Sequence, residues 1–153
     1  MTNRQRLDYA KASPGGYRAM LALEKHVASS GLDRKLLELV KTRASQINSC
    51  AFCIDMHTKD ARHMGESEQR LYGLPAWREA PYYSPRERAA LAWTEAVTKL
   101  DGVIGDDIYG VLKEEFSDSE IADLTFAIVL INGWNRLAVP FRLPAGDHKP
   151  GEE

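Results

Sequence analysis

The chain has 153 residues, of which 44% are hydrophobic and 27% charged, and its formal net charge is −2. These values are typical of one globular domain, which we expect over 1–153 and which can bury roughly two-thirds of its unfolded surface. No long run of one charge, no apolar signal core and no stretch of roughly 20 apolar residues occurs, so we expect a cytoplasmic protein without nucleic-acid or membrane partners.

Capping residues and glycines divide the first half of the chain into four predicted helices. Side chains that accept hydrogen bonds from free backbone N–H groups precede each apolar stripe of helical spacing. The predicted caps are Ser13, Asp33, Asn48 or Ser49, and Ser67. The corresponding helices are expected over 14–31, 33–47, 49–65 and 67–71. The third carries the only two cysteines of the chain.

The second half of the chain predicts three further helices. The segment 73–85 contains three prolines and a glycine and is expected to be a loop, with one helical turn around Trp77. Two capping boxes, Ser84-x-x-Glu87 and Ser117-x-x-Glu120, begin helices. The three helices are expected over 85–99, 106–116 and 121–137. Prolines from about residue 140 onward predict a short extended tail, and no strand pattern occurs, so the predicted fold is all-α with about seven helices.

Cys50, Cys53 and His57 lie at positions i, i+3 and i+7 of the third predicted helix. On a helix these positions share one face, with neighbouring Cβ atoms about 5–6 Å apart. Glu38 lies on the preceding helix and could orient His57 across a helix pair. A nucleophile, a base and an orienting acid form the arrangement that activates covalent catalysts. These four residues are therefore the candidate catalytic residues.

The paired thiols suggest redox chemistry. A thiolate that attacks an O–O bond becomes a sulfenic acid, and a neighbouring thiol converts the sulfenic acid to a disulfide, which an external dithiol reopens. Ideal helix spacing is wider than the 3.5–4.5 Å between Cβ atoms that a disulfide requires. We therefore expect that closing Cys50 to Cys53, with Cys50 in the first turn, distorts the start of the helix.

His57 is expected to act mainly as a proton donor and positioning group. Lowering a thiol pKa from about 8.5 to about 6.5 raises its ionised fraction at pH 7 roughly 25-fold. The lower basicity costs about eightfold in nucleophilicity, by analogy with thiol–disulfide exchange. A net gain of about threefold is small, so protonation of the departing oxygen is the larger contribution.

The motif Glu38-x(11)-Cys50-Ala-Phe-Cys53-Ile-Asp-Met-His57 resembles the alkylhydroperoxidase AhpD core of the carboxymuconolactone decarboxylase-like family. The resemblance extends over most of the chain, from about Tyr17 to Pro144. It includes the segments 58–62, 68–72, 76–79, 87–93 and 131–136.

The resemblance implies an all-helical AhpD-like bundle that assembles as a homo-oligomer, commonly a trimer or a hexamer. It also implies a peroxidase that reduces hydrogen peroxide or a small organic hydroperoxide, with Glu38 and His57 as proton relay. The cysteine nearer the histidine is Cys53, which is expected to attack, with Cys50 as its resolving partner. The position of Cys50 at the helix start instead favours a lower pKa for Cys50, so the order of the two cysteines stays open. No resident cofactor is expected, and the co-substrate is an external dithiol or a thioredoxin-like reductant.

Two features of the chain depart from the best-characterised AhpD proteins. Phe52 stands between the cysteines, where those proteins have a second histidine, which removes one proton-handling group. The chain is also shorter than those proteins, which contain a second, degenerate copy of the helical unit. Oligomerisation would have to supply the missing packing.

Other interpretations of the same residues remain open. Cys50, Cys53, His57 and Glu38 have the right atoms for zinc, although the second pair of ligands typical of a structural site is missing. A non-redox carboxymuconolactone decarboxylase and an oligomeric redox sensor without rapid turnover are the alternative functions. Asn132 and Asn135, in an otherwise apolar helix, are expected to satisfy buried backbone groups or to hold an interface.

Overall fold

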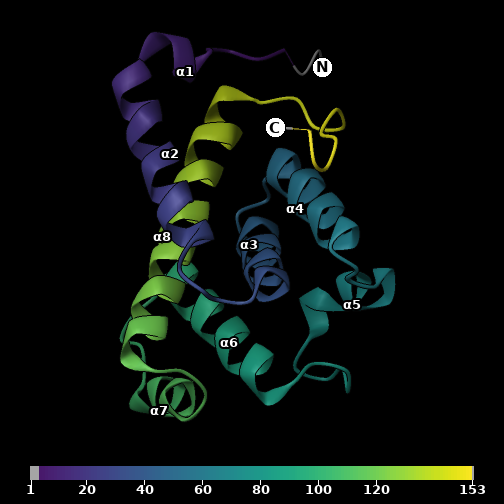
Figure 1. The fold of residues 1–153 in the computed structure, drawn as a ribbon, viewed down its shortest axis with the longest axis vertical. Coiled ribbons are helices and arrows are strands. Elements are labelled where there is room, and N and C mark those ends of the chain that lie inside the picture. Colours follow the sequence, from purple (N-terminus) through teal and green to yellow (C-terminus); the bar gives the residue numbers. More distant parts are fainter. Residues whose placement is uncertain (1–3, 153) are drawn as a thin grey trace.

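The computed structural model describes residues 4–152, and every regular element in this range is a helix (Figure 1). The fold is therefore all-α, as the sequence predicts, with eight α-helices and one short 3₁₀ helix instead of about seven helices. The elements are α1 (Tyr9–Ala12), α2 (Pro14–Ala28), α3 (Arg34–Ile47), α4 (Ala51–His63), α5 (Glu68–Tyr72), η1 (Leu74–Ala76), α6 (Pro85–Lys99), α7 (Asp106–Glu115) and α8 (Asp118–Phe141).

Helix α3 lies at the centre of the fold and packs against α4, α6 and α8. Helix α2 runs beside α8, as the purple-blue and green ribbons show (Figure 1). Residues of α3 from Leu36 to Thr42 are all buried, because helices surround this part of α3. Helix α3, which carries part of the candidate site, is consequently fixed in place by the packing of the core.

Helix α8 is longer than the sequence predicts, because its capping box begins it at Asp118 and it continues to Phe141. Pro140 lies within its last turn instead of in the tail. Proline has no backbone N–H, so Pro140 cannot bond to the Arg136 carbonyl. Both residues are exposed, and this carbonyl can therefore bond to water instead. By length and composition alone α8 could cross a membrane, which the sequence reading missed. In the fold it supplies buried core residues that include Leu124, Ile128 and Ile131.

The tail after α8 folds back along α4. The backbone N–H of Gly146 donates to Asp55 at 3.1 Å, and Lys59 donates to the Gly146 carbonyl at 2.8 Å. His148 lies 2.6 Å from Asp60. The helix α1, which the sequence did not predict, has only four residues, too few for an apolar period to show.

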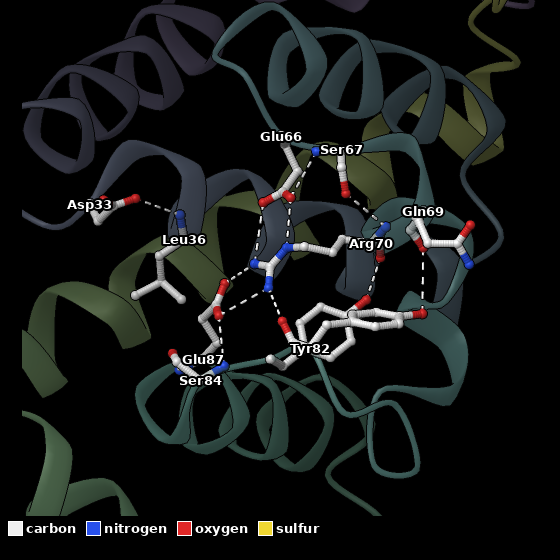
Figure 2. Close-up of polar contacts among 10 residues, drawn as sticks. Asp33, Leu36, Glu66, Ser67, Gln69, Arg70, Tyr82, Ser84 and Glu87 are labelled. Atoms are coloured by element: carbon white, nitrogen blue, oxygen red, sulfur yellow. Dashed lines mark hydrogen bonds and ion pairs between the residues drawn. The ribbon is translucent and has the colours of Figure 1, made fainter.

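Arg70 of α5 holds the irregular segment between α4 and α6 (Figure 2). Its Nε donates to Glu66 at 2.7 Å, and its two terminal nitrogens pair with Glu87 and with the Tyr82 carbonyl. A guanidinium group has enough donors in one plane to make all of these contacts. The loop predicted over 73–85 is thus tied to the start of α6, and it contains η1 close to Trp77.

A tight turn joins α3 to α4. The N–H of Cys50 donates to the Ser45 carbonyl at 2.9 Å, and the N–H of Ser49 donates to the Gln46 carbonyl at 3.2 Å. This pair of bonds is the Schellman motif, in which the residue after the helix cap adopts a left-handed conformation. Ser49 has φ of +54°, so a residue with a Cβ occupies a position that favours glycine.

We expect Ser49→Gly to raise the free energy of unfolding by about 0.5–1 kcal/mol, because glycine removes the left-handed penalty but also loosens the unfolded chain. Ser29→Gly is the matched control. Ser29 has φ of −97°, so glycine there should lower the stability. Chemical denaturation of both variants measures the difference, and equal losses in the two would show that the turn is unstrained.

Candidate active site

Cys50 is the N-cap of α4, not a residue of its first turn. Its backbone is extended, with φ of −89° and ψ of 94°, and its sulfur accepts a hydrogen bond from the Cys53 N–H at 3.3 Å. The prediction that Asn48 or Ser49 caps this helix is therefore wrong. Those two residues instead end α3 and form the turn, so the first residue available as a cap is the cysteine.

The two sulfur atoms face each other at 2.6 Å, and both residues are free cysteines. Because the extended backbone of Cys50 lies outside the helix, its side chain folds over the N-terminus of α4 toward Cys53. The wide spacing of an ideal helix does not apply to this pair, and the predicted distortion of the helix start is not required. The structure confirms that the thiols lie together.

The two thiols have opposite pKa shifts. The side-chain hydrogen bond with Cys53 lowers the pKa of Cys50 to about 7, against burial, which raises it. The same hydrogen bond, with burial, raises the pKa of Cys53 far above its usual range. A thiol pKa near 7 leaves about half of the group as thiolate at neutral pH. Cys50 is the thiolate of the pair, whereas the family resemblance implied that Cys53 is the activated cysteine.

Two polar side chains that the sequence did not assign to the site lie beside the sulfurs. The amide of Asn135 lowers the pKa of both thiols, and the Ser45 hydroxyl lowers that of Cys53. Asn135 donates to the Ser45 hydroxyl at 3.0 Å and accepts from Asn48 at 2.9 Å. The sequence does indicate that Asn135 is an unusual polar residue in an apolar helix, but there it is expected to satisfy buried backbone groups or to hold an interface.

Glu38 and His57 form a buried pair between α3 and α4. Nδ1 of His57 lies 2.8 Å from the Glu38 carboxylate, and the two residues are 8% and 6% exposed. Lys41 lies 3.8 Å from the same carboxylate. Because Glu38 holds Nδ1, Nε2 is the nitrogen left to exchange a proton. The predicted orientation of His57 by Glu38 is thus present.

The two pairs do not touch each other directly. Within residues 4–152, no hydrogen bond joins His57 to either sulfur atom. His57 follows Cys53 by one helical turn on the same face of α4, so the imidazole and the thiols are neighbours on that face. A small molecule bound at this face would be in reach of both.

The metal-ligand set considered from the sequence is not the one that the fold assembles. In the described part of the chain, the one group of three or more candidate ligands within 4.8 Å of one another is Glu38, His57 and Asp60. The two cysteines are not in this group. Its two carboxylates and one imidazole could bind a divalent cation, but the four-residue zinc site through both sulfurs is not supported.

Both cysteines lie under an apolar cover. Cys50 and Cys53 are 1% and 2% exposed, and Phe52, Trp134 and Leu143 pack against the buried cluster that contains them. Two surface cavities, of about 390 and 580 Å³, are lined by other residues. A reagent therefore reaches the thiols only when some of this cover moves.

Comparison with known proteins places the chain in a defined group. The model of the carboxymuconolactone decarboxylase family matches residues 14–96. The uncharacterized protein YdfG of Bacillus subtilis is 44% identical over 88% of this chain and 92% of its own length. A crystal structure of a protein of unknown function from Agrobacterium tumefaciens, named as a candidate antioxidant defence protein AhpD, is 49% identical. It covers 95% of this chain and all of its own, with a TM-score of 0.91.

A more distant structure shares the fold alone. It is an uncharacterized peroxidase-related protein with an alkylhydroperoxidase AhpD core, from Ralstonia eutropha. It is 21% identical over 90% of this chain and 74% of its own, with a TM-score of 0.80. These likenesses agree with the AhpD-like helical bundle that the sequence motif implies.

We expect the thiolate of Cys50 to titrate near pH 7 in the wild-type protein, with the ultraviolet absorbance of the thiolate as the measure. Cys53→Ala removes the side-chain hydrogen-bond partner, so the pKa of Cys50 should rise toward its ordinary value of 9.0. In Cys50→Ala the transition near pH 7 should disappear. A transition that survives in Cys50→Ala and is lost in Cys53→Ala would reverse the assignment.

Proposed function

The chain belongs to the carboxymuconolactone decarboxylase family, and on this basis we propose that it is a thiol-dependent peroxidase of the AhpD type. The observation that carries the proposal is the contact between two free sulfurs, one of which has its pKa lowered to about 7. A thiolate beside a second thiol suits two-electron reduction of a peroxide, because the sulfenic acid that forms can close to a disulfide, which a dithiol then reduces.

The proposed cycle has three steps. The Cys50 thiolate attacks one oxygen of ROOH, the O–O bond breaks, and the other oxygen leaves as ROH after it gains a proton, which makes Cys50 a sulfenic acid. The Cys53 thiol then forms the disulfide and releases water. An external dithiol reduces the disulfide by exchange and is itself oxidised. Cys50 is the attacking residue here because its thiolate is the stabilised one.

His57 supplies the proton in the first step. Glu38 holds Nδ1, so Nε2–H of the imidazolium can protonate the departing oxygen, and the carboxylate stabilises the imidazolium charge. Asp60, within the same group, and His148 beyond it link the pair to the less buried tail. Loss of the proton donor should therefore affect the step that breaks the O–O bond.

Partners and location are part of the same proposal. The reductant is an external dithiol or a thioredoxin-like protein, and the enzyme works in the cytoplasm as a homo-oligomer. Phe126 and Val129 of α8 are 50% and 51% exposed, which supports burial of this helix face against another copy. The peroxide is hydrogen peroxide or a small organic hydroperoxide.

Two alternative functions make different use of the same residues. A redox sensor without turnover is favoured by the burial of both sulfurs, since slow access suits a single oxidation event. A non-redox decarboxylase needs no contact between the cysteines, so the 2.6 Å approach counts against it. Steady-state turnover with excess dithiol distinguishes an enzyme from a sensor.

We expect one equivalent of hydrogen peroxide to remove two titratable thiols per chain, and an added dithiol to sustain continued peroxide consumption. Cys50→Ser should abolish the first step, because it removes the thiolate. Cys53→Ser should stop turnover after a sulfenic acid has formed, because no partner thiol remains. Peroxide consumption assays and thiol titration measure both, and full turnover in either variant would contradict the proposal.

His57→Gln should lower the rate of peroxide reduction by about 10²–10⁴-fold, the usual contribution of a positioned general acid. His63→Gln, an exposed substitution later on the same helix, is the matched control and should leave the rate unchanged. The rate of thiol oxidation after rapid mixing is the measure. Equal rates in the two variants would remove His57 from the mechanism.

A further inference from the structure

One buried hydroxyl group in the core has no hydrogen-bond partner. Oγ1 of Thr42, on α3, is the one buried side-chain nitrogen or oxygen atom in residues 4–152 without a partner, and Thr42 is 0% exposed. Buried polar atoms in folded proteins are nearly always hydrogen-bonded, because leaving one unpaired costs its full desolvation energy.

Four other hydroxyl groups in the helices of this chain bond to their own backbone. The hydroxyls of Ser45, Thr58, Thr94 and Thr125 each donate to the carbonyl group four residues earlier, at 2.6–2.7 Å. This bond is the usual solution for a hydroxyl within a helix. Thr42 could use the Glu38 carbonyl in the same way and does not. Its hydroxyl is therefore available to another partner.

The antiparallel packing of α3 and α4 locates Thr42 relative to the site. Glu38 pairs with His57, and the Ser45 carbonyl accepts from the Cys50 N–H. The two helices are therefore antiparallel, and a residue later in α3 lies level with a residue correspondingly earlier in the chain near α4. The residue four after Glu38 is then level with the residue four before His57. These two residues are Thr42 and Cys53.

Thr42 also lies on the correct side of α3. Residues three and four positions apart share a helix face, and Thr42 follows Glu38 by four and precedes Ser45 by three. The Glu38 side chain contacts His57 of α4, and the Ser45 hydroxyl lies beside the Cys53 thiol. Thr42 thus lies on the α4 side of α3, level with Cys53.

We propose that the Thr42 hydroxyl binds the O–O group of the peroxide beside the thiols. The inference rests on the proposed peroxidase function and adds the group that holds the substrate. When the Cys50 thiolate attacks one oxygen, the hydroxyl donates a hydrogen bond to the oxygen that departs, which His57 protonates. Thr42 thereby stabilises negative charge that develops only as the O–O bond breaks.

The test compares Thr42→Val, which keeps the shape but removes the hydroxyl, with Thr42→Ser, which keeps the hydroxyl. Each dithiol protein is mixed rapidly with hydrogen peroxide and, separately, with a small disulfide reagent that oxidises thiols without an O–O bond. Thr42→Val should react with peroxide about 10–100-fold more slowly, and Thr42→Ser within about threefold of wild type. All three proteins should react equally with the disulfide reagent.

Thermal unfolding excludes a merely structural effect. Removing an unpaired buried hydroxyl should leave the midpoint of Thr42→Val equal to or above that of the wild type. If Thr42→Val does not fold, Thr42→Ala takes its place in the comparison, because alanine also lacks the hydroxyl and is smaller.

The possible failures are distinguishable. If the wild type reacts with peroxide and the variant without the hydroxyl reacts equally fast, the role of Thr42 is wrong and the peroxidase function stands. If the variant slows equally with both oxidants, the hydroxyl serves the thiols and does not bind peroxide. If the wild type reacts with the disulfide reagent but not with peroxide, the proposed function fails, and the Thr42 site fails with it.

Discussion

The site depends on one backbone hydrogen bond, from the N–H of Cys50 to the carbonyl of Ser45. This bond closes the Schellman turn, ends α3 and leaves Cys50 as the first residue that can cap α4. It also fixes the register of the two helices, so that Glu38 meets His57 nineteen residues later in the chain. A different turn length would rotate one helix against the other and separate the thiols from the acid–base pair.

Much of this arrangement could be predicted from the sequence, because it depends on local signals. The capping boxes at Ser84 and Ser117 are both present, and both act on residues three positions away. The pairing of Glu38 with His57 also follows from the sequence, since a short turn between two amphipathic helices makes them antiparallel neighbours. The predicted site residues in α3 and α4 consequently lie in two contacting pairs.

The remaining features depend on single backbone angles or on contacts distant in sequence. The cap could not be assigned because Ser49 adopts a left-handed conformation that residues with a Cβ rarely choose. Asn135 reaches the sulfurs only because α8 packs across α3, which no local pattern indicates. The thiolate order depends on the hydrogen bond between the two side chains, which lowers the pKa of Cys50 and raises that of Cys53. The sequence contains opposing indications for this order, one from the helix start and one from the nearness of Cys53 to His57.

The contact between the sulfurs has a consequence for oxidative damage. A sulfenic acid formed on Cys50 faces the Cys53 sulfur immediately, so condensation is intramolecular and competes with a second peroxide at a large effective concentration. Irreversible conversion to sulfinic or sulfonic acid requires that second encounter, in a site from which bulk solvent is largely excluded. A dithiol arranged in this way would resist hyperoxidation, and its working lifetime would be limited by the supply of reductant, not by self-inactivation.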